Sequence, residues 1–312
     1  MIYCRLPRSR CPPSIRNPRV LKLLTLCGAA FFAAQISSAQ TSQSSAAVST
    51  PPSADYVALG SSIAAGPGVG TRVPGSPAVC MRSQENYPHL YAAKRNISLA
   101  DVTCSGATTA GILTGQLSLP PQIAALGTET KLVTIAIGGN DVHYVGNLFA
   151  WSCQNAPDRI PDTWRPWVCN PTPEEKVDAA FGELEGRMRH IVAAVRQRSP
   201  HARILFIDYM QLLPPAGSCP DRLPLTDAEL VQGRAVAARL AVVTAKVAEE
   251  SGVDLLKASS LSAGHDVCAA DSWVFPLQFP PHLLEFAPLA YHPNEQAMHA
   301  IADALEAMTA PR

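Results

Sequence analysis

The sequence predicts a single α/β domain built on a mostly parallel β-sheet. Short apolar stretches that suit buried strands alternate with longer stretches of helical periodicity along the chain. Three of the apolar stretches run into turns of small residues. We find no internal repeat and no second domain boundary, so the alternation favours one sheet covered by helices.

Five stretches read as strands, and the clearest is 131–137 (KLVTIAI), which ends in the turn Gly138-Gly-Asn-Asp141. The predicted strands, in chain order, cover residues 55–59, 97–103, 131–137, 203–209 and 253–258. Ligands in open α/β sheets bind at the carboxyl ends of the strands, so the small-residue turns mark the expected edge for a site.

Helical periodicity predicts helices over residues 86–95, 174–198, 226–251 and 295–308. Thr226 and Glu229 have the spacing of a capping box, and Pro293 is placed to open the last helix. The small-residue turn 104–111 is suited to open one more helix, where unpaired backbone N–H groups are available to an anion.

The composition points to a small, neutral or apolar partner. The 312 residues include 25 basic and 25 acidic side chains, with 47% hydrophobic and only 16% charged residues. A chain without net charge lacks the basic surface that nucleic acids or anionic membranes require. Such a length and apolar content suffice for a sizeable core.

Residues 1–39 resemble a cleavable signal peptide. Several arginines precede an apolar run over 23–34, and Ser37 and Ala39 fit a cleavage site. The run is shorter than the about 20 residues that a membrane span needs, so we expect no integral membrane segment in the mature chain. Residues 40–54 read as a flexible leader, residues 55–312 as the folded domain, and the product as secreted or periplasmic.

The cysteine count agrees with export. Six cysteines follow the signal segment, and an even number in an exported chain predicts disulfides, although their pairing stays open at this point. No Cys-x-x-Cys or His-x-x-x-His pair is present, so we expect no metal site.

Gly60-Ser61-Ser62 follows the first strand and presents two candidate nucleophiles at the functional edge of the sheet. A serine needs a base, and histidine is the usual one. His292 stands out because it follows an aromatic, proline-rich loop and precedes the last helix, whereas His265 and His282 are weaker candidates.

Acyl transfer also needs donors for a developing oxyanion. The side-chain amide of Asn140 lies at the end of the clearest strand, and Gly106 offers a backbone N–H that no side chain obstructs. For either residue alone, a role as a simple turn former is the competing interpretation.

Taken together and in order, these motifs resemble the SGNH (GDSL) hydrolase family. The segments YVALGSS, CSGATTAG, IAIGGND and HPNEQA are similar to those of its secreted actinobacterial-type esterases and lipases, and the resemblance covers about residues 55–308. It implies a three-layer α/β/α sandwich with a flavodoxin-like, five-stranded sheet. It also implies a carboxylic ester hydrolase that uses no cofactor.

The resemblance assigns roles by position. Ser62 matches the nucleophile and would also donate its own N–H to the oxyanion, Gly106 and Asn140 match the other two donors, and His292 matches the base. The family's successive cysteine pairing implies disulfides Cys80–Cys104, Cys153–Cys169 and Cys219–Cys268.

Two positions depart from the family pattern. Ser61 replaces the acidic residue of Gly-Asp-Ser, which leaves two hydroxyls to distinguish. Leu289 stands where a triad aspartate is expected. We therefore predict a Ser-His dyad in which a backbone carbonyl, that of Leu289, orients the imidazole; Asp266 reaching in from elsewhere is the alternative.

The predicted substrate is a fatty acyl or aryl ester, free or in a lipid, bound by a monomer. An apolar loop directly precedes His292 and suggests an acyl-binding wall, with ordinary core packing as the alternative; its aromatic residues are Trp273, Phe275, Phe279 and Phe286. A carbohydrate O-acyl esterase or acyltransferase would be favoured by an open cleft of Trp151, Trp164 and Trp167. A non-catalytic binding module on the same fold is the third possibility.

Overall fold

Five parallel strands form the sheet in the order β2-β1-β3-β4-β5, in a computed structural model that describes residues 54–310. The strands are β1 (Tyr56–Gly60), β2 (Leu99–Asp101), β3 (Leu132–Ala136), β4 (Arg203–Ile207) and β5 (Asp254–Leu256). This is the flavodoxin-like order, and it confirms the predicted fold class. The predicted signal peptide 1–39 lies outside the described residues, as does nearly all of the leader 40–54.

β1 and β3 occupy the centre of the sheet, and every residue of both strands is buried. They pair in register from Tyr56 with Leu132 to Gly60 with Ala136, so both strands end at the same level. The edge strands β2 and β5 are shorter than the predicted stretches because each pairs with one neighbour only. The turns that follow β1 and β3 therefore lie side by side at one edge.

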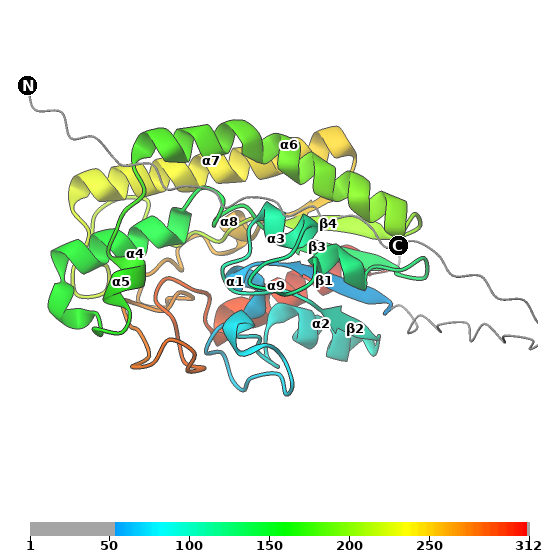
Figure 1. The fold of residues 1–312 in the computed structure, drawn as a ribbon, viewed down its shortest axis with the longest axis horizontal. Coiled ribbons are helices and arrows are strands. Elements are labelled where there is room, and N and C mark those ends of the chain that lie inside the picture. Colours follow the sequence, from blue (N-terminus) through cyan, green and yellow to red (C-terminus); the bar gives the residue numbers. More distant parts are fainter. Residues whose placement is uncertain (1–53, 311–312) are drawn as a thin grey trace, which may run out of the picture. The chain divides into compact units, whose positions relative to one another are not determined.

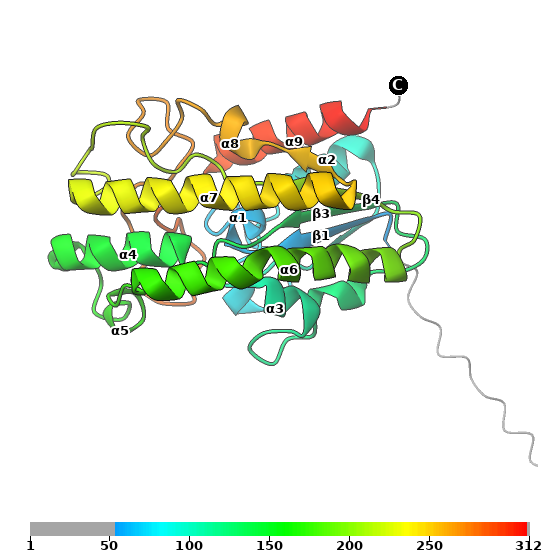
Figure 2. The ribbon, with the colours of Figure 1, turned by 90° about the horizontal axis from the view of Figure 1, so that it is seen from above.

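Helices cover both faces of the sheet, as the sandwich prediction requires (Figure 1). Figures 1 and 2 show α6 (Glu174–Arg198) and α7 (Asp227–Ser251) side by side over one face, with α3 (Thr109–Leu113) beside α6. The other face is covered by α2 (Tyr87–Arg95) and α9 (Glu295–Thr309), which pack against each other.

The long helices follow the predicted boundaries. The buried face of α6 consists of Val177, Phe181, Leu184, Met188, Ile191, Val192 and Val195. Thr226 and Glu229 form the predicted capping box, with the Glu229 N–H donating to the Thr226 hydroxyl at 3.4 Å and the Thr226 N–H donating to the Glu229 carboxylate at 2.7 Å. Within residues 54–310, no helix combines the length and apolar content needed to cross a bilayer.

Sequence periodicity did not predict four of the helices in residues 54–310. They are α1 (Ser62–Ala65), α4 (Tyr144–Asn155), α5 (Arg165–Val168) and α8 (Ala258–Leu261), with 3₁₀ turns at Ala78–Cys80, Gln122–Ala125 and Pro157–Arg159. α4 is the longest of these helices, and it packs against α7.

Candidate active site

The turn after β1 brings two serines to the carboxyl edge of the sheet. A side chain at Gly60 would place its Cβ 2.7 Å from the Ala136 carbonyl oxygen on β3, so only glycine fits there. The buried Gln122 side chain is hydrogen-bonded to both backbone groups of Gly60, at 2.8 Å from its N–H and 3.0 Å from its carbonyl. Ser62 is the first residue of α1, so its backbone N–H has no partner within the helix.

The two serine hydroxyls have different partners. Ser62 Oγ lies 2.8 Å from His292 Nε2, across 230 residues of sequence. Ser61 Oγ is instead fully buried and lies 2.9 Å from the Tyr209 hydroxyl, just beyond the end of β4. The structure therefore brings Ser62, and not Ser61, to the imidazole. Sequence reasoning missed Tyr209 as the partner of Ser61.

A short bridge between the aromatic loop and the segment before α9 holds His292. The Phe275 N–H donates to the His292 carbonyl at 2.9 Å, and the Tyr291 N–H donates to the Phe275 carbonyl at 2.8 Å. Tyr291 adopts a left-handed φ of 58°, which is costly for a residue other than glycine. Its buried hydroxyl is anchored by Ser152 of α4 at 2.6 Å. This backbone strain next to His292 is the kind that accumulates at functional sites.

The imidazole is oriented by a backbone carbonyl. His292 Nδ1 lies 2.8 Å from the carbonyl oxygen of Ala290, one residue beyond the Leu289 carbonyl that we expected to hold it. Because a carbonyl only accepts, Nδ1 must carry the proton, and Nε2 is left free to accept the proton of Ser62. Asp266 accepts a hydrogen bond from the Cys268 N–H at 2.9 Å, and within residues 54–310 no carboxylate pairs with His292.

Burial keeps this imidazole neutral. His292 is 2% exposed, and desolvation lowers its pKa from 6.5 to about 4, although the Ala290 and Leu289 carbonyls act in the opposite direction. At neutral pH the histidine therefore carries no charge and is ready to act as a base.

Activity should accordingly survive mild acid. A protonated imidazole cannot accept a proton from Ser62. If His292 is the base, kcat/KM should therefore hold from about pH 8 downward and fall to half near pH 4. The measurement is kcat/KM on a soluble ester across that range, with circular dichroism confirming folded protein at each pH. A half-point near 6.5, the pKa of an exposed histidine, would show that the lowered value is wrong.

Two further turns, one after β2 and one after β3, carry donors at the same edge of the sheet as Ser62. Within residues 54–310, the N–H groups of Ser62 and Gly106 donate to no protein acceptor. Gly106 is exposed, has a φ of +76°, and has open space where a side chain would stand. Asn140 follows β3 and uses one hydrogen of its amide on the Ala107 carbonyl, at 2.8 Å. The second amide hydrogen remains available for a ligand.

The Asp141 side chain links these two turns through hydrogen bonds. Sequence reasoning did not single out this residue. Its buried carboxylate accepts from the Thr109 N–H at 3.0 Å and from the Thr109 hydroxyl at 2.5 Å, at the start of α3. Burial raises the pKa of Asp141, and the Thr109 hydrogen bonds and nearby Arg187 oppose that rise. The Gly106 and Asn140 turns are thus joined by two hydrogen-bonded links.

A serine with a neutral histidine, flanked by free donors, is the arrangement of a serine hydrolase. Comparison with known proteins decides the family: the model of the GDSL-like lipase/acylhydrolase family matches residues 58–300, most of the chain. This chain belongs to the GDSL-like lipase/acylhydrolase family. It is a carboxylic ester hydrolase of the lipase/esterase type.

The relatives of this GDSL-like acylhydrolase include Streptomyces lipases. It is 33% identical over 296 residues to Lipase 2 of Streptomyces coelicolor, which covers 91% of this chain and 97% of that lipase. Two crystal structures, of the extracellular lipase of Streptomyces rimosus and of phospholipase A1 of Streptomyces albidoflavus, each align with a TM-score of 0.64 and 25% identity. Each alignment covers 82% of this chain and 99% of the other.

Aromatic side chains flank the His292 side of the acylhydrolase site. The ring of Phe149, on α4, stacks on the imidazole of His292 with 6.1 Å between centroids. Phe279 lies 5.1 Å from Phe149, and Trp164 lies 5.0 Å from Phe279. We call Phe149, Trp164 and Phe279 the aromatic cluster. Of the four residues predicted to form a wall, Phe279 belongs to it, whereas Trp273 stacks on His265 at 4.0 Å.

The tryptophans do not form an open cleft. Trp151 and Trp164 are buried, and the Trp164 indole N–H donates to the Pro280 carbonyl at 2.6 Å. Trp167 is 75% exposed on α5. The arrangement that would favour a carbohydrate substrate is therefore not formed.

Within residues 54–310, three disulfides brace this acylhydrolase, and their pairs are those that the family resemblance implies. Cys80–Cys104 ties the loop after α1 to the Gly106 turn. Cys153–Cys169 joins α4 to the end of α5. Cys219–Cys268 joins the loop after β4 to the segment that leads to His292. Disulfides of this kind are consistent with export.

Proposed function

We propose that Ser62 is the nucleophile of this GDSL-like acylhydrolase and that His292 is its base. The observation that carries the proposal is the 2.8 Å contact between Ser62 Oγ and His292 Nε2. The Nδ1 proton is held by the Ala290 carbonyl, which fixes the tautomer that a base requires.

In the first half-reaction, Ser62 Oγ attacks the ester carbonyl carbon as its proton passes to His292 Nε2. The carbonyl oxygen becomes an oxyanion, which accepts hydrogen bonds from the Ser62 N–H, the Gly106 N–H and the Asn140 amide. As the intermediate collapses, the ester C–O bond breaks and Nε2 returns the proton to the leaving alcohol.

In the second half-reaction, water attacks the acyl group on Ser62 and gives its proton to Nε2. Collapse of this intermediate releases the acid and returns the proton to Ser62 Oγ. The Ala290 carbonyl steadies the imidazolium formed in both halves. A carbonyl carries a partial charge, so it stabilises that cation less than a triad aspartate would.

We propose a fatty acyl ester as the substrate. The aromatic cluster next to His292 offers an apolar surface where an acyl chain would lie. The names of the relatives, lipases and a phospholipase A1, agree with such a substrate.

Activity toward p-nitrophenyl esters of increasing chain length tests this substrate class. Each methylene that becomes buried contributes about 0.8 kcal/mol, so kcat/KM should rise up to about fourfold per carbon beyond acetate. Phe149→Ala should flatten that rise, whereas Trp167→Ala, which removes an exposed ring on α5, should leave it unchanged. A preference for acetate over butyrate and octanoate would contradict the substrate class.

We further propose that the protein works outside the cytoplasm, as a monomer. The three disulfides support export and an oxidising environment. Residues 1–39 would then serve as the signal peptide and 40–54 as a leader.

A further inference from the structure

A glutamine behind the Gly106 turn directly precedes a strained turn of the backbone. Gln116 opens a tight turn that the Leu119 N–H closes onto the Gln116 carbonyl at 2.7 Å. Both central residues, Leu117 and Ser118, adopt left-handed φ angles, 47° and 64°, that favour glycine. Such strain persists only where the surrounding structure fixes it, and it is frequent near functional sites.

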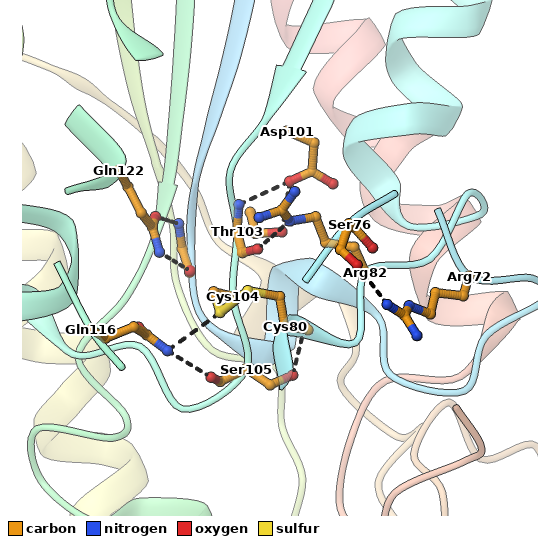
Figure 3. The surroundings of a disulfide bond; sticks show 11 residues. Arg72, Ser76, Cys80, Arg82, Asp101, Thr103, Cys104, Ser105, Gln116 and Gln122 are labelled. Carbon is orange, nitrogen blue, oxygen red and sulfur yellow. Dashed lines mark hydrogen bonds between the residues drawn. A yellow bond between two sulfur atoms is a disulfide. The ribbon is translucent and has the colours of Figure 1, made fainter. Parts of the chain in front are cut away.

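The Gln116 amide reaches the backbone next to Gly106 (Figure 3). Its Nε2 donates to the Ser105 carbonyl at 3.0 Å and to Cys104 Sγ at 3.3 Å. Ser105 is held from its other side as well, because its N–H and hydroxyl both donate to the Cys80 carbonyl, at 3.1 and 3.0 Å. The Cys80–Cys104 disulfide and Gln116 thus fix Ser105 together.

The Ser105 carbonyl belongs to the same peptide group as the Gly106 N–H. The described chain contains no cis peptide bond, so this C=O and this N–H point in opposite directions. A donor that is hydrogen-bonded to the Ser105 carbonyl therefore fixes the direction of the Gly106 N–H. Among residues 54–310, this N–H has no protein acceptor. Glycine at 106 has open space around it and a left-handed φ, so its own side chain does nothing to limit rotation of this peptide.

Gln116 also lacks a partner that a purely structural glutamine would need. Its Oε1 is buried without a hydrogen bond, at the edge of a cavity of about 330 Å³ lined by Cys80, Cys104 and Gln122 among others. A buried acceptor without a partner is destabilising, so the favourable polar contacts of this side chain are those of Nε2. The donor on Nε2 is the part of this side chain that contacts the Gly106 turn.

We propose that Gln116 is a positioning residue that aims the Gly106 N–H at the oxyanion by holding the Ser105 carbonyl. The proposal rests on the proposed function, in which Gly106 is an oxyanion donor. Through the same bond Gln116 polarises the peptide group, because a carbonyl that accepts a hydrogen bond leaves its N–H a better donor.

Gln116→Met tests the proposal, since methionine keeps the length and removes the donor. We expect kcat to fall by about tenfold or more, short of the roughly 100- to 1000-fold that loss of a whole oxyanion donor costs, while KM changes little. Gln84→Met is the matched control, because Gln84 Nε2 also donates to a loop carbonyl, that of Arg72, at 3.1 Å. It should leave kcat within about twofold of wild type.

A transition-state analogue distinguishes a misoriented Gly106 N–H from a general loss of structure in the variant. Ser62 Oγ adds to the carbon of a trifluoromethyl ketone, its proton passes to His292, and the ketone oxygen becomes an oxyanion in the donor site. The affinity of Gln116→Met for this ketone should fall by the same factor as kcat/KM. Gln116→Glu places a carboxylate against the Ser105 carbonyl, so its affinity for the ketone and its kcat/KM should fall at least as much. This variant replaces Gln116→Met in the test if the methionine variant folds poorly.

The inference would be overturned if Gln116→Met and Gln116→Glu fold and keep wild-type kcat, or lose no more kcat than Gln84→Met. This outcome would leave the proposed function standing. A loss confined to KM would also overturn the inference. A wild-type enzyme that hydrolyses no ester would overturn the proposed function as well, so the two failures are distinguishable.

Discussion

Ser62→Ala should lower kcat by about a millionfold, the loss seen when a serine hydrolase is left without its nucleophile. Ser62 Oγ is the hydroxyl that faces His292 Nε2, so its removal leaves the imidazole without a proton to accept and the ester carbonyl without an attacking atom. Steady-state hydrolysis of a p-nitrophenyl ester by the purified variant, corrected for the uncatalysed rate, measures the effect.

Ser61→Ala is the control for that substitution. The Ser61 hydroxyl is bonded to Tyr209 and fully buried, so we expect kcat within a few-fold of wild type. Its loss should instead appear as a lower free energy of unfolding, by about 1 kcal/mol, because a buried hydrogen bond is broken. A large loss of kcat in Ser61→Ala together with an active Ser62→Ala would mean that the roles of the two serines are exchanged.

His292→Ala should cost about as much as Ser62→Ala, because nucleophile and base act as a unit. Without the imidazole, Ser62 would have to lose its proton to water. His265→Ala is the matched control: His265 is also packed in this region, but it stacks on Trp273 and its Nδ1 donates to the Asp271 carbonyl at 2.8 Å. Hydrolysis by the control should stay close to wild type.

Asp266→Asn decides between a dyad and a triad. Removing the acid of a true triad lowers kcat by about ten-thousandfold. Since Asp266 accepts from the Cys268 N–H, and the Ala290 carbonyl already holds His292 Nδ1, we expect the asparagine variant to retain kcat within about threefold. A triad-sized loss in folded Asp266→Asn would contradict the dyad.

The architecture was largely predictable because the sheet depends on local signals. β1 and β3 are mostly apolar and buried on both faces, which makes such strands recognisable from sequence. The long helices α6 and α7 carry periodic apolar faces or explicit caps. α1 and α4 were missed for physical reasons: α1 has only four residues, and α4 packs against several elements and so lacks a single apolar face.

The candidate site was predictable only where a residue itself carries the chemistry. Ser62, Gly106, Asn140 and His292 stand in readable motifs, and the fold places the Ser62 hydroxyl against the imidazole of His292. The partner of the other hydroxyl, Tyr209, lies 148 residues from Ser61, and no motif marks it.

Residues that act by positioning other groups were hard to predict from the sequence. The carbonyl that holds His292 lies one position from the expected one, because the bend at Tyr291, with its left-handed φ, is a property of the folded chain. Phe149 lies in a helix that periodicity did not predict, so its contact with His292 was not expected. The apolar run Phe149-Ala150-Trp151 is the one local sign of a buried segment there. Gln116 and Gln122 act mainly through hydrogen bonds to backbone groups, and no motif marks such residues.

The most direct test of the Ser62–His292 dyad is labelling of the mature protein with a fluorophosphonate, followed by intact mass and peptide mapping. Ser62 Oγ would displace fluoride from phosphorus while His292 accepts the serine proton. We predict one adduct per chain on Ser62, in wild type and in Ser61→Ala, and none in Ser62→Ala or His292→Ala within the same labelling time. An adduct mapped to Ser61, or a folded wild-type protein that takes up no label, would contradict the account.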